Sequence, residues 1–250
     1  MTPDDMTPAT QPPTTRRRLL LNVGVVVTFC VVMAAVTLPN ICRVRVAADR
    51  AKDTNNLKQL GLAVENYDAA MGQMIGPYAQ VSPGVLNTEM SFRVSLMAYI
   101  ESTDLQTRID WTQPWDSARN APMTSIPFKI FQSPDTPDAT KPDTPYRVFY
   151  GGGALFAADG TPVKLTDIPD GASNTILFVH ATETVPWAKP QEFAYTPTTP
   201  LPPLGSPGLG KGGFNAAMAD GSVRYFKATI AEADLRSLIE KADGRGRDTE

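Results

Sequence analysis

One histidine limits the catalytic chemistry available to this chain of 250 residues. His180 follows an apolar run, Thr175–Val179, and would have to act as the base in any Ser-His-Asp or Cys-His arrangement. A carboxylate pair from Glu183, Asp220 and Asp170 is the other option, but Asp170-Gly171 and Asp220-Gly221 are dipeptides typical of turns. We therefore expect no catalytic residue and no enzyme. A hydrolase that uses these carboxylates is the weakest alternative.

Residues for cofactor or metal binding are also scarce. Cys30 and Cys42, with the single histidine, are too few for the four ligands of a zinc site. The run Gly151–Gly153 lacks the Lys-Ser/Thr and helix of a phosphate-binding loop, and it favours a turn or a close approach of two backbones. Solvated charge is favoured over a calcium site for three acidic residues in a Pro-rich loop: Asp135, Asp138 and Asp143. We expect no cofactor and no metal.

The composition argues against one class of partner and indicates where loops lie. The formal net charge is -3, and the chain has no basic cluster beyond Arg16–Arg18, so nucleic acid is not an expected partner. The 23 prolines outnumber the 18 glycines, which predicts long stretches without helix or central strand. Many of these prolines fall in two segments, 134–145 and 186–207, which we interpret as loops on the head.

The N-terminal part predicts a membrane anchor. Residues 1–18 are rich in Thr and Pro and are expected to be a disordered cytoplasmic tail. Residues 19–38 carry no charge, and twenty helical residues span the hydrocarbon core of a bilayer. The run is longer than the apolar part of a cleaved signal peptide, so a signal-anchor is favoured. Arg16–Arg18 predict a single-pass protein of the cytoplasmic membrane, with its N-terminus inside and its head periplasmic.

The membrane helix is expected to continue outward over residues 39–72. Apolar residues recur there at three- and four-residue steps, and Gly72 is expected to end the helix. Pro39 should kink the helix at the membrane exit, and Asp53-Thr54 offers a second break with a cap. Asn22 lies near the membrane surface, where it would hydrogen-bond another helix or simply sit at the interface.

Residues 73–250 are expected to form the head. Phe92–Tyr99 predicts a short helix and Ile230–Ala242 a closing amphipathic helix. Strands are predicted at Tyr146–Tyr150 and Thr175–Val179. A hairpin is predicted from Phe214–Met218 and Val223–Phe226, with Asp220-Gly221 as a two-residue turn in which both residues have positive φ. The expected fold class is therefore α+β.

Several segments resemble one known family. They are LPNICRVRVAADRAKDTNNLKQLGLAVENY at 38–67, PWDSARN at 114–120, IPDGASNTILFV at 168–179, VPWAKP at 185–190 and GGFNAAMADGSVRYF at 212–226. Their order and spacing resemble a planctomycete family of unknown function with a type IV pilin or type II secretion pseudopilin-like N-terminal helix. The resemblance implies a pilin-like fold, in which a long N-terminal helix packs against an antiparallel sheet. It also implies homo- or hetero-oligomers with other pilin-like subunits through that helix.

The chain differs from this family at the positions where family members are cleaved and where their subunits pair during assembly. Arg17 and Arg18 stand where the family has its peptidase cleavage pair, and Asn22 stands where it has an assembly glutamate. Asp53 and Gln132 replace two frequent cysteines, and Gly210 replaces a frequent histidine. The resemblance therefore implies neither cleavage nor a disulfide here.

Two functions are compatible with these features. The first is a membrane-anchored, pseudopilin-like protein of structural or secretion-related assembly, with the lipid bilayer and similar subunits as partners. The alternative is a bitopic protein whose head binds a surface ligand such as a glycan. That ligand would bind through loops near Trp111, Trp115 and Trp187.

Overall fold

The computed structural model describes residues 14–82, 84–100, 103–134, 136, 138–206 and 213–244. Within these ranges, side chains are not described for residues 14–19, 21, 34–43 and 103–105. The chain forms two compact units, Met1–Arg45 and Val46–Glu250. The fold class is α+β, as the sequence predicts, with helices and antiparallel strands in one chain.

The first helix, α1 (Thr14–Met71), has 58 residues. It begins inside the segment 1–18 that the sequence suggested to be disordered, and the arginines there are good helix formers. Residues 1–13 lie outside the described residues. Pro39 lies within the bounds of α1, which does not end there. Asn22 is on α1 with an exposed side chain.

In the first unit, α1 carries exposed apolar side chains. Nine of them are between 47% and 71% exposed: Leu20, Val23, Val25, Val26, Val27, Phe29, Val31, Val32 and Met33. Within the described part of the chain, no helix meets the combined length and apolarity needed to cross a membrane.

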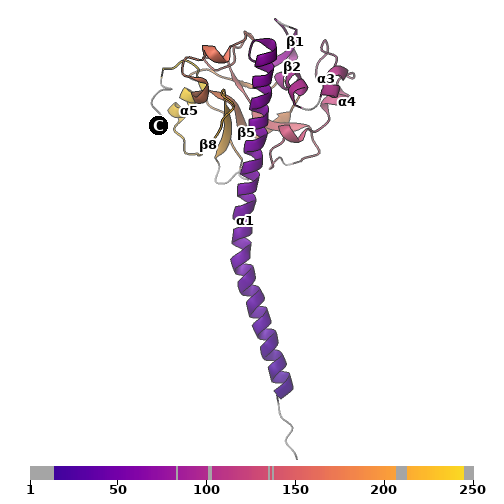
Figure 1. The fold of residues 1–250 in the computed structure, drawn as a ribbon, viewed down its shortest axis with the longest axis vertical. Coiled ribbons are helices and arrows are strands. Elements are labelled where there is room, and N and C mark those ends of the chain that lie inside the picture. The colour runs from indigo at the N-terminus through magenta and orange to yellow at the C-terminus, as the bar shows by residue number, and fades with distance from the viewer. Residues whose placement is uncertain are drawn as a thin grey trace, which may run out of the picture. The chain divides into compact units, whose positions relative to one another are not determined.

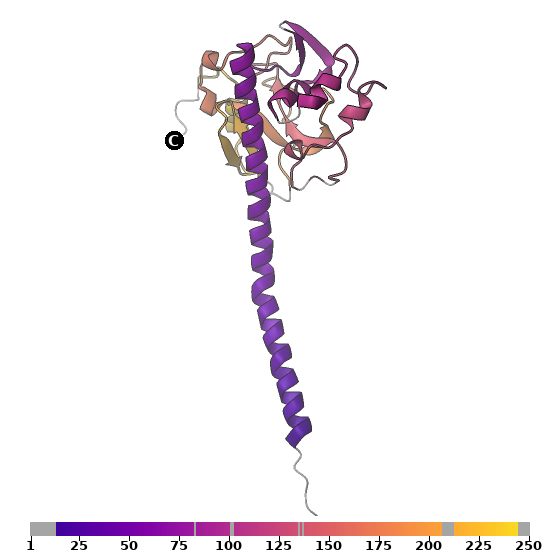
Figure 2. The same cartoon turned by 45° about the vertical axis from the view of Figure 1, so that its right-hand side comes forward.

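In the second unit, the remainder of α1 belongs to the core of the head (Figures 1 and 2). Four side chains at helical spacing are buried: Leu57, Leu60, Val64 and Tyr67. Met71, the last residue of α1, is exposed. The expected break at Asp53-Thr54 is wrong, because Asp53 is buried and hydrogen-bonded to the sheet within a continuous helix. The helix ends as expected, with Gly72 at φ 70° and its N–H donating to Asp68 O.

A four-stranded antiparallel sheet lies against α1, in the order β3-β5-β7-β8. Its strands are β3 (Asp143–Arg147), β5 (Ile176–Pro186), β7 (Phe214–Met218) and β8 (Val223–Phe226). The strand expected at Tyr146–Tyr150 is divided: β4 (Phe149–Tyr150) leaves this sheet and pairs in parallel with β6 (Phe193–Ala194). Pro145 is tolerated because β3 is an edge strand and its register shifts between Thr144 and Tyr146.

The β7–β8 hairpin has the bounds that the sequence predicts, but its turn differs. Gly221 N–H donates to Met218 O at 3.0 Å, and Met218 N–H donates to Ser222 O at 2.8 Å. With Gly221 at φ 77°, this is the pattern of a three-residue loop with a bulge, and not of a two-residue turn. The turn contacts α1: a Cβ on Gly61 would lie 3.2 Å from Gly221 Cα.

The remaining elements complete the head. The hairpin β1 (Tyr78–Ser82) and β2 (Val85–Ser91) was not expected from the sequence. The helix α2 (Phe92–Leu96) continues as η1 (Met97–Tyr99), which matches the helix expected at 92–99. The closing helix is α5 (Glu232–Ile239). Short helices fill the loops: α3 (Thr103–Arg108), α4 (Ala121–Thr124), η2 (Lys129–Phe131), η3 (Leu165–Asp167) and η4 (Ala172–Asn174).

The core forms two clusters. One includes the buried face of α1 with α2 and one face of the sheet, and the other includes α5 with the opposite face.

Candidate functional site

Polar side chains from three strands converge on Asp53 of α1. Successive side chains of a strand point to opposite faces, so His180 shares the face of Phe178, and Asn215 shares that of Ala217. Phe178 and Ala217 belong to the core cluster that contains α1. Alternation along β5 and β7 therefore directs a histidine and an asparagine at the helix.

Asp53 receives three short polar contacts. His180 Nδ1 lies 3.0 Å from Asp53 Oδ1, and the Tyr146 hydroxyl donates to the same oxygen at 2.7 Å. Asn215 Nδ2 donates to Asp53 Oδ2 at 2.7 Å. A further amide from α1 extends the network: Asn56 Nδ2 donates to Gln132 O at 2.8 Å. One carboxylate thus joins α1 to β3, β5 and β7.

The environment keeps this carboxylate ionised. Burial alone would raise the pKa of Asp53, but two influences of His180, a hydrogen bond and its charge, act in the opposite direction. With the hydrogen bonds from Tyr146 and Asn215, they hold the pKa of Asp53 below its usual value of 3.8. An ionised carboxylate can only accept, so His180 Nδ1 carries the proton in this contact.

The Asp53–His180 pair is buried, and this limits its possible roles. Asp53 is 0% exposed and His180 is 2% exposed, so a substrate has no access to either group. The arrangement can hold a helix on a sheet, because three strands donate to one helical carboxylate. The only histidine of the chain therefore lies in the core, where it joins β5 to α1.

A second buried ion pair lies on the other side of Tyr146. Arg93 of α2 contacts Glu192 at 2.7 Å, with both side chains at most 2% exposed, and also donates to Tyr146 O. Glu192 Oε2 accepts from Val148 N–H at 3.0 Å. The guanidinium of Arg147 stacks on the Phe193 ring, 3.7 Å from its centroid. These charges join α2 to β3 and to the segment that contains β6.

The acidic residues singled out from the sequence serve in turns or strands. Asp170 accepts from the backbone N–H groups of Asp243 and Gly244 at 2.7 and 3.1 Å. Asp220 Oδ1 accepts from Ser222 N–H at 2.9 Å inside the hairpin turn. Asp138 Oδ1 accepts from Thr140 N–H, and Asp143 begins β3. The structure does not bring these groups together.

No metal centre is seen among the residues that the structure describes, where no three His, Cys, Asp or Glu side chains are grouped suitably. Asp135 and Gly210 lie outside the described residues. Cys30 is a free, exposed thiol, and the side chain of Cys42 is not described.

The glycine run at 151–153 is a place of close backbone approach. All three glycines have positive φ, and a Cβ on Gly152 would lie 2.7 Å from Thr196 Cα. This confirms the interpretation as a turn against another backbone.

The tryptophans are unequal as binding residues. Trp187 is 1% exposed, stacks on Phe131 with centroids 5.5 Å apart and donates from Nε1 to Ile126 O at 3.0 Å. It therefore cannot stack on a glycan. Trp111 and Trp115 are partly buried and pack against the core.

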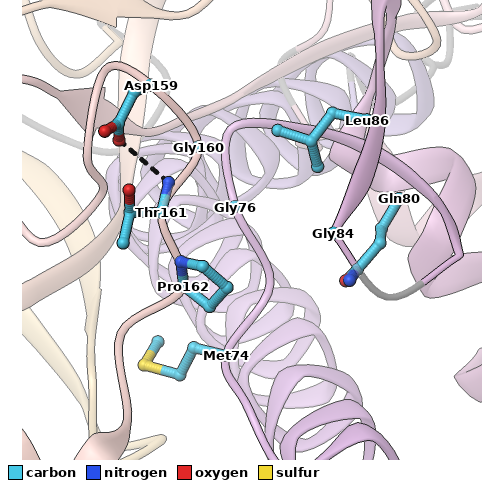
Figure 3. Close-up of a pocket in the computed structure, with 9 residues that line it drawn as sticks. All are labelled: Met74, Gly76, Gln80, Gly84, Leu86, Asp159, Gly160, Thr161 and Pro162. Carbon is cyan, nitrogen blue, oxygen red and sulfur yellow. Dashed lines mark hydrogen bonds between the residues drawn. The ribbon is translucent and has the colours of Figure 1, made fainter.

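Among the residues that the structure describes, Asp159 lines two hollows at the surface of the head. One is a cleft of about 220 Å³ between the β1–β2 hairpin and residues 159–162 (Figure 3). The other is an open hollow of about 440 Å³, lined mainly by residues 151–159 and by Lys241.

Sequence reasoning missed the cluster at Asp53 and the cleft. A usable signal for the cluster was present: Asp53 lies between apolar stripes on α1, and Asn215 interrupts the run FNAAM. A polar residue on a core-facing position needs a partner, which predicts a buried network but not its members.

The fold and site define an α+β protein whose N-terminal helix completes the core of its head. A family model described as "Protein of unknown function (DUF1559)" matches residues 43–201, more than half of the chain, and the chain belongs to this family. This confirms the expected membership in a family of unknown function. The β7–β8 hairpin lies beyond the matched range. No curated protein and no solved structure matched the chain.

Proposed function

We propose that this protein is a single-pass, membrane-anchored, pseudopilin-like subunit that acts in structural or secretion-related assembly. Residues 19–38 form the anchor, the N-terminus faces the cytoplasm and the head is extracytoplasmic. Neighbouring subunits contact one another through the N-terminal helix.

The observation that carries this proposal is the contrast between the two parts of α1. Between Leu20 and Met33 the helix exposes apolar side chains on all sides, without a charge. A helix that is apolar all round requires an apolar environment. From Asp53 to Tyr67 the same helix is amphipathic and packs into the head. Such a division suits a helix that passes from lipid into a folded domain.

The anchor is tested by alkaline extraction of membranes that contain the full chain. The variant Val26→Arg/Val27→Arg should be released, because each arginine near the centre of a span costs about 2.5–3.5 kcal/mol on insertion scales. The matched control, Val81→Arg/Val85→Arg, adds the same charges at exposed positions of the head and should stay in the membrane fraction. Release of the unmodified chain would contradict the anchor.

Assembly through the helix is tested separately by oxidative crosslinking at Cys30, which is exposed. Packed helices should give a crosslinked dimer that persists in Cys42→Ser and disappears in Cys30→Ser. Monomer alone, from a chain that is retained in the membrane, would contradict the helix contact and leave the anchor intact.

N-terminal processing is reported by the intact mass of the extracted protein. We expect a chain that begins at Met1 or Thr2, because Arg17 and Arg18 occupy the place of the cleavage pair. A mass that corresponds to cleavage near Arg18 would show that the protein is processed like a pilin.

A further inference from the structure

Arg147, the last residue of β3, is a buried cation without a close anion. Its side chain belongs to a residue that is 4% exposed, and its Nε has no hydrogen-bond partner in the described part of the chain. The contact seen for its guanidinium is the Phe193 ring. Buried charges in proteins are paired and hydrogen-bonded, because burial without partners is costly. An unpartnered buried guanidinium therefore indicates a place for an anion.

The nearest buried carboxylate is already engaged. Glu192 Oε1 accepts from Arg93 Nη1 at 2.7 Å, and Glu192 Oε2 accepts from Val148 N–H at 3.0 Å. A turn of Glu192 towards Arg147 would leave these two buried donors without their acceptor. Arg93, Glu192 and Arg147 together carry two positive charges and one negative charge. The cluster thus has an excess of one positive charge.

The electrostatics of Arg147 agree with this excess. Burial lowers the pKa of Arg147 below its usual value of 12.5, and the positive charge of Arg93 acts in the same direction. Glu192 acts in the opposite direction without compensating for burial. An arginine side chain is nevertheless protonated at neutral pH. The guanidinium is therefore a charged donor in a place that penalises charge.

Arg147 lies on the face of the sheet opposite to the Asp53 cluster. It pairs with Val179 of β5, which belongs to the core cluster that contains α5. Phe193 packs against this cluster and is itself only partly buried. The exposed Glu183 is near enough to influence the pKa of Arg147, although the structure shows no ion pair between them. The stacked pair of Arg147 and Phe193 thus lies close to the surface of the head.

We propose that Arg147 binds a carboxylate of another molecule, which is either a small organic acid or an acidic side chain of a peptide. The carboxylate oxygens accept from the guanidinium, while Phe193 covers one face of the guanidinium. A planar carboxylate matches the planar guanidinium, and its single negative charge balances the excess in the cluster. Both properties favour a carboxylate over a tetrahedral phosphate dianion. The inference does not depend on membrane anchorage.

The test uses the ¹⁵N-labelled full chain in detergent micelles and follows the Nε–H signal of Arg147. This signal is assigned as the one that disappears in Arg147→Lys. Sodium acetate and Ac-Ala-Glu-Ala-NH₂ supply the carboxylate, and acetamide and Ac-Ala-Gln-Ala-NH₂ are their uncharged matches. At constant ionic strength, a carboxylate should shift the signal saturably and the amides should not.

The two carboxylates distinguish the possible sources of the ligand. Tighter binding of acetate indicates a small acid, and tighter binding of the glutamate peptide indicates a partner protein. The absence of a saturable shift with either carboxylate, or an equal shift with the matched amide, would overturn the proposal.

In variants, binding is followed at the backbone amide of Phe193. Arg147→Lys keeps the charge but loses the planar donor group, so it should weaken binding at least about tenfold, a factor that corresponds to one charge-assisted hydrogen bond. Arg224→Lys is the matched control, because Arg224 is an exposed arginine of β8 in the same sheet, and it should leave binding unchanged.

A variant at Glu183 tests the site without altering the core, should Arg147→Lys fail to fold. Glu183→Gln removes a nearby negative charge at an exposed position, and it should tighten binding of the carboxylate about twofold. Binding that occurs only in Glu183→Gln would show that Glu183 is itself the partner of Arg147, and it would overturn the proposal.

Discussion

At the scale of single residues, Asp53 makes the most consequential contact in the protein. It is the acceptor for groups from three strands, and it lies on the helix that those strands must hold. Removal of a buried carboxylate costs more free energy than its intact hydrogen bonds contribute. The reason is that its former donors stay buried, where water cannot replace the lost acceptor.

Asp53→Ala should therefore destabilise the protein strongly. The substitution removes the acceptor that the Tyr146 hydroxyl, the Asn215 amide and His180 share, and the loss of a buried partner costs about 1–3 kcal/mol for each group. We expect a loss of more than about 3 kcal/mol in the free energy of unfolding, measured by urea denaturation. Asp138→Ala, in an exposed turn, is the control and should change little. An equal effect of the two variants would show that the cluster does not hold the helix.

The same carboxylate should give an acid-dependent stability. The pKa of Asp53 is lower in the folded protein than in the unfolded chain, so its contribution is complete above the ordinary value of 3.8. It is lost as the pH falls through the folded-state pKa. The free energy of unfolding, measured between pH 7 and pH 2, should fall more steeply below about pH 4 than in Asp53→Asn, which has no carboxyl group at this position. Parallel curves would contradict the assignment.

The roles of some residues could be predicted from the sequence and those of others could not, for a physical reason. The Asp220-Gly221 dipeptide signals a turn through local backbone preference, and the structure places a turn there. The partnership of Asp53 with His180 joins residues 127 positions apart, and no local preference encodes it. The roles of turn residues can thus be predicted from local backbone preference. The buried network cannot, because its members come together only when the whole head is packed.

At the scale of elements, periodicity predicted the strongest segments well. The hairpin at 214–226 and the helix at 92–99 have the expected bounds, because two apolar runs flank the Asp-Gly dipeptide and apolar residues at helical spacing mark the helix. The β1–β2 hairpin was missed because its sequence, with exposed Val81 and Val85, does not alternate as a half-buried strand does. The division of β3 from β4 was missed because it depends on parallel pairing with distant β6.

The contact between the glycine run and the residues that follow β6 gives a prediction for this segment. Gly152→Ala should destabilise the head, because its Cβ would approach backbone atoms of Tyr195 and Thr196 that cannot move as a side chain would. Gly84→Ala is the control: Gly84 has φ 78°, but a Cβ there meets nothing within 4 Å. Both variants incur backbone strain of about 1–2 kcal/mol, and only Gly152→Ala adds a clash. The midpoint temperature of thermal unfolding should be clearly lower for Gly152→Ala than for Gly84→Ala. Equal midpoint temperatures would show that the clash does not destabilise the head.

At the scale of the whole molecule, α1 belongs to two units in which its apolar side chains differ in exposure. In Met1–Arg45 it exposes apolar side chains, whereas in Val46–Glu250 it supplies part of a closed core. The sequence predicted that the helix continues outward, with a kink at Pro39 and a second break at Asp53-Thr54, whereas α1 runs unbroken through Asp53. It did not predict how completely the head depends on that helix, because the depth of burial is set by the sheet and by the Asp53 cluster.

This dependence predicts where the chain can be shortened. Four buried side chains of α1 — Leu57, Leu60, Val64 and Tyr67 — contribute about 1.5–3 kcal/mol each, and their sum of about 6–12 kcal/mol equals the entire stability of a typical domain. A chain that begins at Val46 keeps all four and should unfold cooperatively in urea. A chain that begins at Gly72 lacks them and should show neither a cooperative transition nor a near-ultraviolet circular dichroism spectrum. If the shorter chain folds, α1 is an attachment to the head; if it does not, the helix and the sheet form one core, and loss of the helix from the sheet unfolds the head.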